Sequence, residues 1–132
     1  MAGLHFEFVS PETVLFSGDV DQVDLPGIEG DLGVLPGHAP IVTLLRPGIV
    51  TIMREGQREP VVVVGGFAEM GPGGLTVLAD RAGSREDFDL DLLASDIKDA
   101  EEDVADCKDD ARRDRLARRL DQLRALQAAL GQ

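Results

Sequence analysis

Few residues in this chain are of types that act as nucleophiles, bases or metal ligands. The histidines are His5 and His38, and the cysteine is Cys107. Nucleophilic catalysis needs a base beside the nucleophile, and the sequence does not pair either histidine with Cys107. His5 falls on a strand-like segment and His38 in a turn-rich one. Cys107 falls on an apolar helical stripe, where a small core residue is the better interpretation.

The chain also lacks the spacings that mark metal and phosphate sites. Two histidines and one cysteine make no recognisable zinc pattern. The acids of residues 86–110 lack the spacing and central glycine of a calcium loop, so a solvated helix face explains them better. Gly65-Gly66 and Gly71-Pro72-Gly73-Gly74 match neither the Walker loop nor the dinucleotide fingerprint. We expect no catalytic residue, metal or cofactor, and therefore no enzyme.

Composition restricts the classes of partner. The 132 residues carry a formal net charge of -12 and include no tryptophan or tyrosine. Such a chain repels phosphate backbones and anionic lipids, so we expect no direct contact with nucleic acid or membrane. No apolar run approaches the roughly 20 residues of a membrane-spanning helix, and the N-terminus does not resemble a secretory signal. With one cysteine, these features predict a reducing, intracellular compartment.

The chain changes character near Gly83-Ser84-Arg85. Glycine and proline are concentrated before this point. Residues 86–110 hold 12 acids and 2 bases, whereas residues 111–132 hold 2 acids and 6 arginines. We predict a β-sandwich domain at residues 1–84 and an α-helical hairpin domain at residues 85–132.

The first domain shows the two-residue period of β-strands. Leu4, Phe6 and Phe8 alternate with polar residues, and the valines of residues 61–64 are typical of a strand buried on both faces. About ten short strands, separated by turns such as Gly71-Pro72-Gly73-Gly74, predict a sandwich or flattened barrel.

The densest set of turn residues lies at residues 29–48, with four glycines and three prolines. Glycine permits φ > 0 and proline fixes φ. The segment is therefore predicted to fold sharply and to present a polar tip at Glu29-Gly30-Asp31. The alternative is an ordinary sandwich corner whose acids are merely solvated.

The second domain has two apolar stripes at helical spacing, which predict an antiparallel pair of helices. The stripes consist of Leu90, Leu93, Ile97, Ala100, Val104, Cys107 and Ala111, and of Leu116, Leu120, Leu123, Leu126 and Leu130. Asp87 or Asp89 is expected to cap the first helix, and Lys108-Asp109-Asp110 to form the turn. An acidic helix beside an arginine-rich one is favoured by charge, although each exposed pair contributes only about 0–1 kcal/mol.

Several segments together closely resemble the epsilon subunit of bacterial F-type ATP synthases. These segments are residues 8–12, 16–18, 29–40, 46–48, 64–69 and 75–80. The resemblance covers the whole chain, because that family also ends in a two-helix hairpin, and it is most specific over residues 4–80. It implies a non-catalytic subunit of the rotating central stalk, which couples rotation of the proton-driven c ring through the gamma subunit to ATP synthesis.

The resemblance also implies where partners bind. The sandwich would bind gamma on one side and the c ring at its base, where the turn of Glu29, Gly30 and Asp31 would face polar loops of the ring. His38 would lie beside that turn, or would only hydrogen-bond local backbone. The complex would hold the chain peripherally, at the cytoplasmic face of the bacterial inner membrane, so that membrane contact is indirect.

In the same family the hairpin either folds against the sandwich or extends along gamma and inhibits ATP hydrolysis. Its arginines would then meet acidic segments of the catalytic alpha and beta subunits, or would only offset the acidic first helix. These arginines are Arg112, Arg113, Arg115, Arg118, Arg119 and Arg124. Some members bind ATP through a motif, broadly Ile/Leu-Asp-x-x-Arg-Ala. Here residues 90–95 lack its arginine, so we expect no ATP site.

Two other functions stay open on the sequence alone. A free-standing β-sandwich that recognises another protein would be a stable monomer without affinity for gamma. A small hydrolase would need a polar cluster that the sequence does not reveal, and loss of activity in His38→Ala would point to it.

Overall fold

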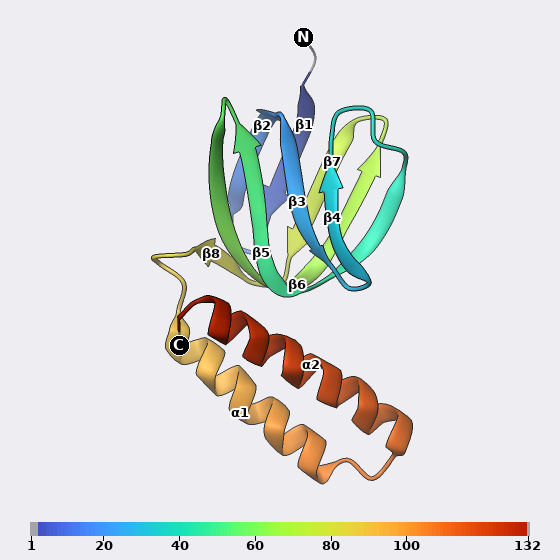
Figure 1. The fold of residues 1–132 in the computed structure, drawn as a ribbon, viewed down its shortest axis with the longest axis vertical. Coiled ribbons are helices and arrows are strands. Elements are labelled where there is room, and N and C mark those ends of the chain that lie inside the picture. The colour runs from blue at the N-terminus through green and yellow to red at the C-terminus, as the bar shows by residue number, and fades with distance from the viewer. Residues whose placement is uncertain (1–2, 132) are drawn as a thin grey trace. The chain divides into compact units, whose positions relative to one another are not determined.

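The computed structural model describes residues 3–131, which form eight strands and two helices (Figure 1). In chain order these are β1 (Leu4–Val9), β2 (Val14–Val20), β3 (Gln22–Gly27), β4 (Gly30–Val34), β5 (Ile41–Arg54), β6 (Gln57–Gly71), β7 (Gly74–Ala79), β8 (Ala82–Ser84), α1 (Leu90–Asp106) and α2 (Asp110–Ala129). The chain divides into two compact units between Glu86 and Asp87. The first unit holds the strands and the second holds the helices.

The strands form one continuous sheet in the order β2-β1-β7-β6-β5-β3-β4, with β8 paired to β6. β5 and β6 are the longest, at 14 and 15 residues, and pair along almost their whole length. The start of β5 and the end of β6 continue into β7, β1 and β2. The other halves pair mainly with β3 and β8. Because the long strands bend between these halves, the sheet folds into the two layers of a β-sandwich (Figure 1).

Proline and glycine mark the bend. The ladder between β5 and β6 skips one pair, Arg46 and Gly65, just before Pro47, and the register is the same on both sides. Gly66 has φ +138°, and a side chain there would come within 2.1 Å of the Leu78 carbonyl oxygen. Only glycine fits such an approach, so the backbones of β6 and β7 lie in close contact at Gly66.

The core of the first unit lies between the two layers. Its buried residues are Leu4, Phe6, Phe8, Val20, Val23, Leu25, Val34, Leu45, Val50, Ile52, Val61, Val63, Ala68, Met70, Leu75, Val77 and Ala79. The Phe6 and Phe8 rings are fully buried, with centroids 5.7 Å apart, and each such side chain contributes roughly 1.5–3 kcal/mol. All four valines of residues 61–64 are buried, as predicted.

The predicted sandwich is confirmed, but it has eight strands in place of about ten. Pro47-Gly48 ends the turn-rich segment that was predicted to fold sharply, and Gly65-Gly66 is a second pair of residues typical of turns. In the structure β5 and β6 run through these positions, because each strand keeps its partner on both sides of the interruption.

The second unit is the predicted helical hairpin. The Asp89 side chain, not that of Asp87, caps α1 by accepting a 3.0 Å hydrogen bond from the Leu92 backbone N–H. The buried residues of the hairpin helices are Leu93, Ile97, Leu120, Leu123 and Leu126.

The prediction that the first stripe continues through Cys107 to Ala111 was wrong. α1 ends at Asp106, and Cys107 adopts extended backbone as its C-cap. The Arg113 guanidinium donates to the Cys107 carbonyl oxygen from Nη2 at 2.7 Å and from Nε at 3.1 Å. This pair of bonds satisfies a carbonyl that the helix would otherwise use, so a side chain ends the helix where no glycine or proline does.

Candidate functional site

The acid-bearing turn predicted as a contact point lies at the tip of the β3–β4 hairpin. Gly27 and Gly30 are the last paired residues, and Ile28 and Glu29 form the turn. Gly30 has φ +144°, and a side chain on Gly27 would lie 2.6 Å from the Gly30 carbonyl oxygen. The turn therefore depends on its glycines. Glu29, Gly30 and Asp31 are all exposed, so the structure brings these three predicted residues together on one tip.

Arg46 fastens this tip to β5, although the sequence did not mark it as a functional residue. Its Nη1 donates to the Gly27 carbonyl oxygen at 2.5 Å, and its Nη2 forms an ion pair with Asp31. Nearby, the Ile28 backbone N–H donates to the Leu44 carbonyl oxygen at 2.8 Å. The sequence contained Arg46 only as part of a family motif, and nothing in its pattern indicated a partner 15 residues away.

His38 lies apart from the tip. Glu29 directly precedes β4, whereas His38 comes after β4, so all five residues of this strand lie between Glu29 and His38. At about 3.3 Å per residue this is roughly 16 Å along the strand. The His38 Nδ1 donates to the Ala39 carbonyl oxygen at 2.7 Å. This is the local backbone bond predicted as the alternative role, and the structure does not bring His38 beside the acidic turn.

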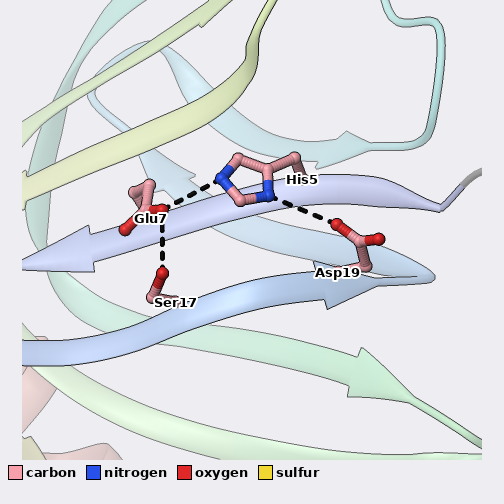
Figure 2. Close-up of polar contacts among 4 residues, drawn as sticks. All are labelled: His5, Glu7, Ser17 and Asp19. Carbon is pink, nitrogen blue, oxygen red and sulfur yellow. Dashed lines mark hydrogen bonds and ion pairs between the residues drawn. The ribbon is translucent and has the colours of Figure 1, made fainter.

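A second polar group lies on the neighbouring strands β1 and β2 (Figure 2). The His5 ring contacts Glu7 through Nε2 at 2.9 Å and Asp19 through Nδ1 at 3.2 Å. The Ser17 hydroxyl donates to Glu7 at 2.8 Å. The hydrogen bond to Asp19, and then that to Glu7, raises the pKa of His5 above its ordinary value of 6.5. We call these four residues the His5 cluster.

The His5 cluster contains the residue types of a serine hydrolase without their arrangement. The Ser17 hydroxyl donates to the Glu7 carboxylate and not to the His5 ring, so it lacks the histidine base of a serine hydrolase (Figure 2). Because His5 bridges an acid on its own strand and one on β2, the cluster is suited to bracing the two strands.

Apolar side chains cross the outer face of the same layer. Leu44, Phe67 and Leu78 are register partners on β5, β6 and β7, and they are 61%, 38% and 43% exposed. Val9 and Val14 continue the line onto β1 and β2. Facing partners lie about 4.5–5.5 Å apart, so these five residues form a continuous strip, which we call the apolar row.

Sequence reasoning missed the apolar row because it assigned apolar runs to the core. The available signal was the two-residue period within β6. Ala68 and Met70 are buried, so the residues between and beside them, Phe67 and Glu69, face outward. A contiguous exposed strip of large apolar side chains is typical of a protein-contact surface.

The six predicted arginines of α2 fall into two groups. Arg124 pairs with Glu101 of α1 at 2.6 Å, and Arg113 holds the Cys107 carbonyl oxygen. The other four are exposed and make no hydrogen bond or ion pair with the rest of the described residues: Arg112, Arg115, Arg118 and Arg119. Offsetting of the acidic helix by a direct ion pair is therefore seen for Arg124 alone among the arginines of α2.

Neither helix of residues 3–131 combines the length and hydropathy of a membrane span. Within the same residues, no group of three or more His, Cys, Asp or Glu side chains is arranged to hold a metal ion.

Comparison with known proteins identifies relatives along nearly the whole chain. The family model for the ATP synthase delta/epsilon chain beta-sandwich domain matches residues 3–85. The ATP synthase epsilon chain of Maricaulis maris is 48% identical over 125 residues, which cover 95% of this chain and 94% of the relative. The ATP synthase epsilon chain 2 of Nitrobacter hamburgensis is 50% identical over 130 residues, which cover 98% and 96%.

Solved structures of mitochondrial ATP synthases also contain chains similar to this one. A chain in the Euglena gracilis mitochondrial ATP synthase, solved as an OSCP/F1/c-ring assembly, matches with a TM-score of 0.73 at 27% identity, covering 98% of this chain and 82% of that one. A chain from the central stalk/c-ring of the Tetrahymena thermophila enzyme shares the fold, with a TM-score of 0.54 at 13% identity over 66% and 72% of the two chains. With the sandwich, the hairpin and these relatives in agreement, the chain belongs to the ATP synthase epsilon chain family.

Proposed function

We propose that the chain is a non-catalytic rotor subunit, which joins the gamma subunit to the c ring and so couples proton-driven rotation to ATP synthesis. The observation that carries the proposal is the apolar row on the outer face of the sandwich. An exposed row of this kind needs a protein partner to cover it, and similar chains are found in assemblies that contain F1 and the c ring.

We assign the apolar row to gamma. Leu44, Phe67 and Leu78 stand on three neighbouring strands of a rigid sheet, so their positions do not have to be ordered on binding. Side chains that are already fixed in place lower the entropy cost of binding. The His5 cluster lies two and four residues along β1 from Val9, on the same face, and adds a charged margin.

We assign the tip of Glu29, Gly30 and Asp31 to the c ring. The tip is exposed and acidic, and a short turn between paired strands resists displacement better than a long loop. His38, at the far end of β4, is proposed to contact the stalk near gamma. Binding through the c ring would hold the chain at the cytoplasmic face of the inner membrane.

The hairpin is proposed to restrain ATP hydrolysis when it contacts the catalytic alpha and beta subunits. Arg112, Arg115, Arg118 and Arg119 support this role, because they have no partners within the described residues and are available for an acidic surface. Arg113 and Arg124 are engaged inside the hairpin and contribute less. No cofactor is proposed, since the family's ATP motif lacks its arginine at residues 90–95.

Binding of gamma by a matched pair of variants tests the proposal. Phe67→Ser removes the centre of the apolar row, whereas Leu92→Ser removes an apolar side chain of similar exposure on α1, which is not assigned to gamma. We expect Phe67→Ser to weaken gamma binding by about tenfold or more and Leu92→Ser to leave it unchanged. Equal binding by both variants would contradict the assignment. A wild-type monomer without affinity for gamma would favour a free-standing binding module.

The hairpin is tested separately in the assembled enzyme. Deletion of residues 86–132 should leave gamma binding and coupling in place. ATP hydrolysis should rise if the hairpin restrains it, and replacement of the four unpartnered arginines by glutamine should reproduce that rise. Unchanged hydrolysis in both variants would remove the inhibitory role and leave the rotor role standing.

A further inference from the structure

We propose that Arg46 is a positioning residue, which sets the direction and charge of the tip that meets the c ring. The inference rests on the proposed function of that tip. Glu29 and Asp31 were predicted as equivalent contact acids, and the contacts of Arg46 divide them into different roles.

The tip is weakly held by the sheet itself. β3 pairs with β5 at Asp24, but the register then shifts, and the next paired residue is Gly27 opposite Leu45. Between these points the ladder to β5 is broken, so beyond Gly27 only the Ile28 N–H to Leu44 carbonyl bond ties the turn to the neighbouring strand. The β3–β4 hairpin is paired up to Gly27 and Gly30, so the turn itself is short and stiff. Few bonds to β5 set the direction of this hairpin, unless a side chain adds to them.

Arg46 supplies that hold from the adjoining strand. One guanidinium joins β5, where Arg46 originates, to the Gly27 carbonyl of β3 and the Asp31 carboxylate of β4. The Arg46 side chain is 29% exposed, so the bond to Gly27 is partly shielded from water. The following Pro47 restricts the backbone of Arg46 to extended conformations, which directs the side chain toward the turn. A planar guanidinium reaches two acceptors at once, which an ammonium group does less well.

The same contacts separate the two acids. The charge of Asp31 is matched by Arg46, whereas Glu29 makes no hydrogen bond or ion pair with the other described residues. Glu29 is therefore the acid that offers an uncompensated charge to a basic or polar group of the ring, and Asp31 with Arg46 braces it. Arg46 acts through this brace and does not itself contact the partner.

The first test measures the tip in the full chain without partners. Arg46→Gln should raise the amide hydrogen-exchange rate at Ile28 by about tenfold, the value expected for loss of a charge-assisted hydrogen bond. Arg46→Lys should restore part of the protection. Arg54→Gln is the matched control, because Arg54 lies at the far end of the same strand and contacts the Phe16 ring. Unchanged exchange in Arg46→Gln would overturn the proposal.

The second test measures proton pumping per ATP hydrolysed by the assembled enzyme in vesicles. We expect a loss of pumping in Arg46→Gln, partial rescue in Arg46→Lys, and a loss in Glu29→Gln without faster exchange at Ile28. If Glu29→Gln alone lowers pumping while Arg46→Gln only loosens the turn, the positioning role is wrong. If neither variant changes pumping although the turn loosens, the c-ring assignment of the tip is wrong and the brace itself stands.

Discussion

At the scale of single residues, His5 is the clearest titrating group. Its bonds to Asp19 and Glu7 raise its pKa above 6.5, so the protonated ring favours the folded state. This contribution is fully present below pH 6.5 and is lost as pH rises through the folded-state pKa. We expect His5→Gln to remove this part of the pH dependence, as measured by urea unfolding between about pH 5.5 and 8.5, with His38→Gln as control. An NMR titration placing His5 at its ordinary pKa would contradict the prediction.

A second residue-scale prediction concerns the turn between β5 and β6. Glu55 has φ +55° and Gly56 has φ +78°, the signs that a two-residue hairpin turn requires. Glutamate adopts this conformation at a cost, whereas asparagine tolerates it. Glu55→Asn should therefore stabilise the fold by about 0.5–1 kcal/mol, measured by urea unfolding.

Gly56→Ala provides the opposite control for that turn. No atom lies within 4 Å of a side chain built there, so any destabilisation reflects the backbone conformation alone. We expect a loss of about 1 kcal/mol. If both Glu55→Asn and Gly56→Ala stabilised the fold, or both destabilised it, the turn would differ from the one described.

At the scale of elements, the loop between α1 and α2 depends on Arg113. The two bonds from its guanidinium to the Cys107 carbonyl hold the loop closed. Each is worth roughly 0.5–1.5 kcal/mol, so Arg113→Gln should open the loop more often and accelerate thiol labelling of Cys107 by about tenfold. Arg112→Gln is the matched control, since Arg112 is adjacent in sequence but its side chain makes no hydrogen bond within the described residues. Equal labelling rates in the two variants would contradict the assigned contact.

The sheet shows why element boundaries were harder to predict than element types. The sequence predicted short strands separated by turns, with a sharp fold within residues 29–48, whereas β5 is one strand over Ile41–Arg54. Whether Pro47-Gly48 ends a strand or bends it depends on a partner that keeps its register on both sides. That partner is β6, and its own interruption at Gly65 matches the one in β5. A local sequence pattern describes one strand and does not show its register with the partner strand.

At the scale of the whole molecule, the core of the sandwich is formed by residues of the first unit alone. Every residue of the sandwich core precedes Asp80, so the core contains no helix residue. We expect a chain truncated after Glu86 to unfold in one cooperative thermal transition, within about 5 °C of the sandwich transition in the full chain, which corresponds to about 1 kcal/mol. Calorimetry measures this directly. A broad, non-cooperative transition would show that the sandwich needs the hairpin to fold.

The sequence by itself determined the two kinds of element, their order and the family. Periods of two and of three to four residues arise from local backbone geometry, and family motifs are read in chain order, so neither needs a distant partner. The tertiary structure alone decided that Arg46 braces Asp31, that Leu44, Phe67 and Leu78 align on an outer face, and which arginines of α2 find no partner within residues 3–131. Each of these depends on strand register or helix pairing, which brings together residues that no local pattern connects.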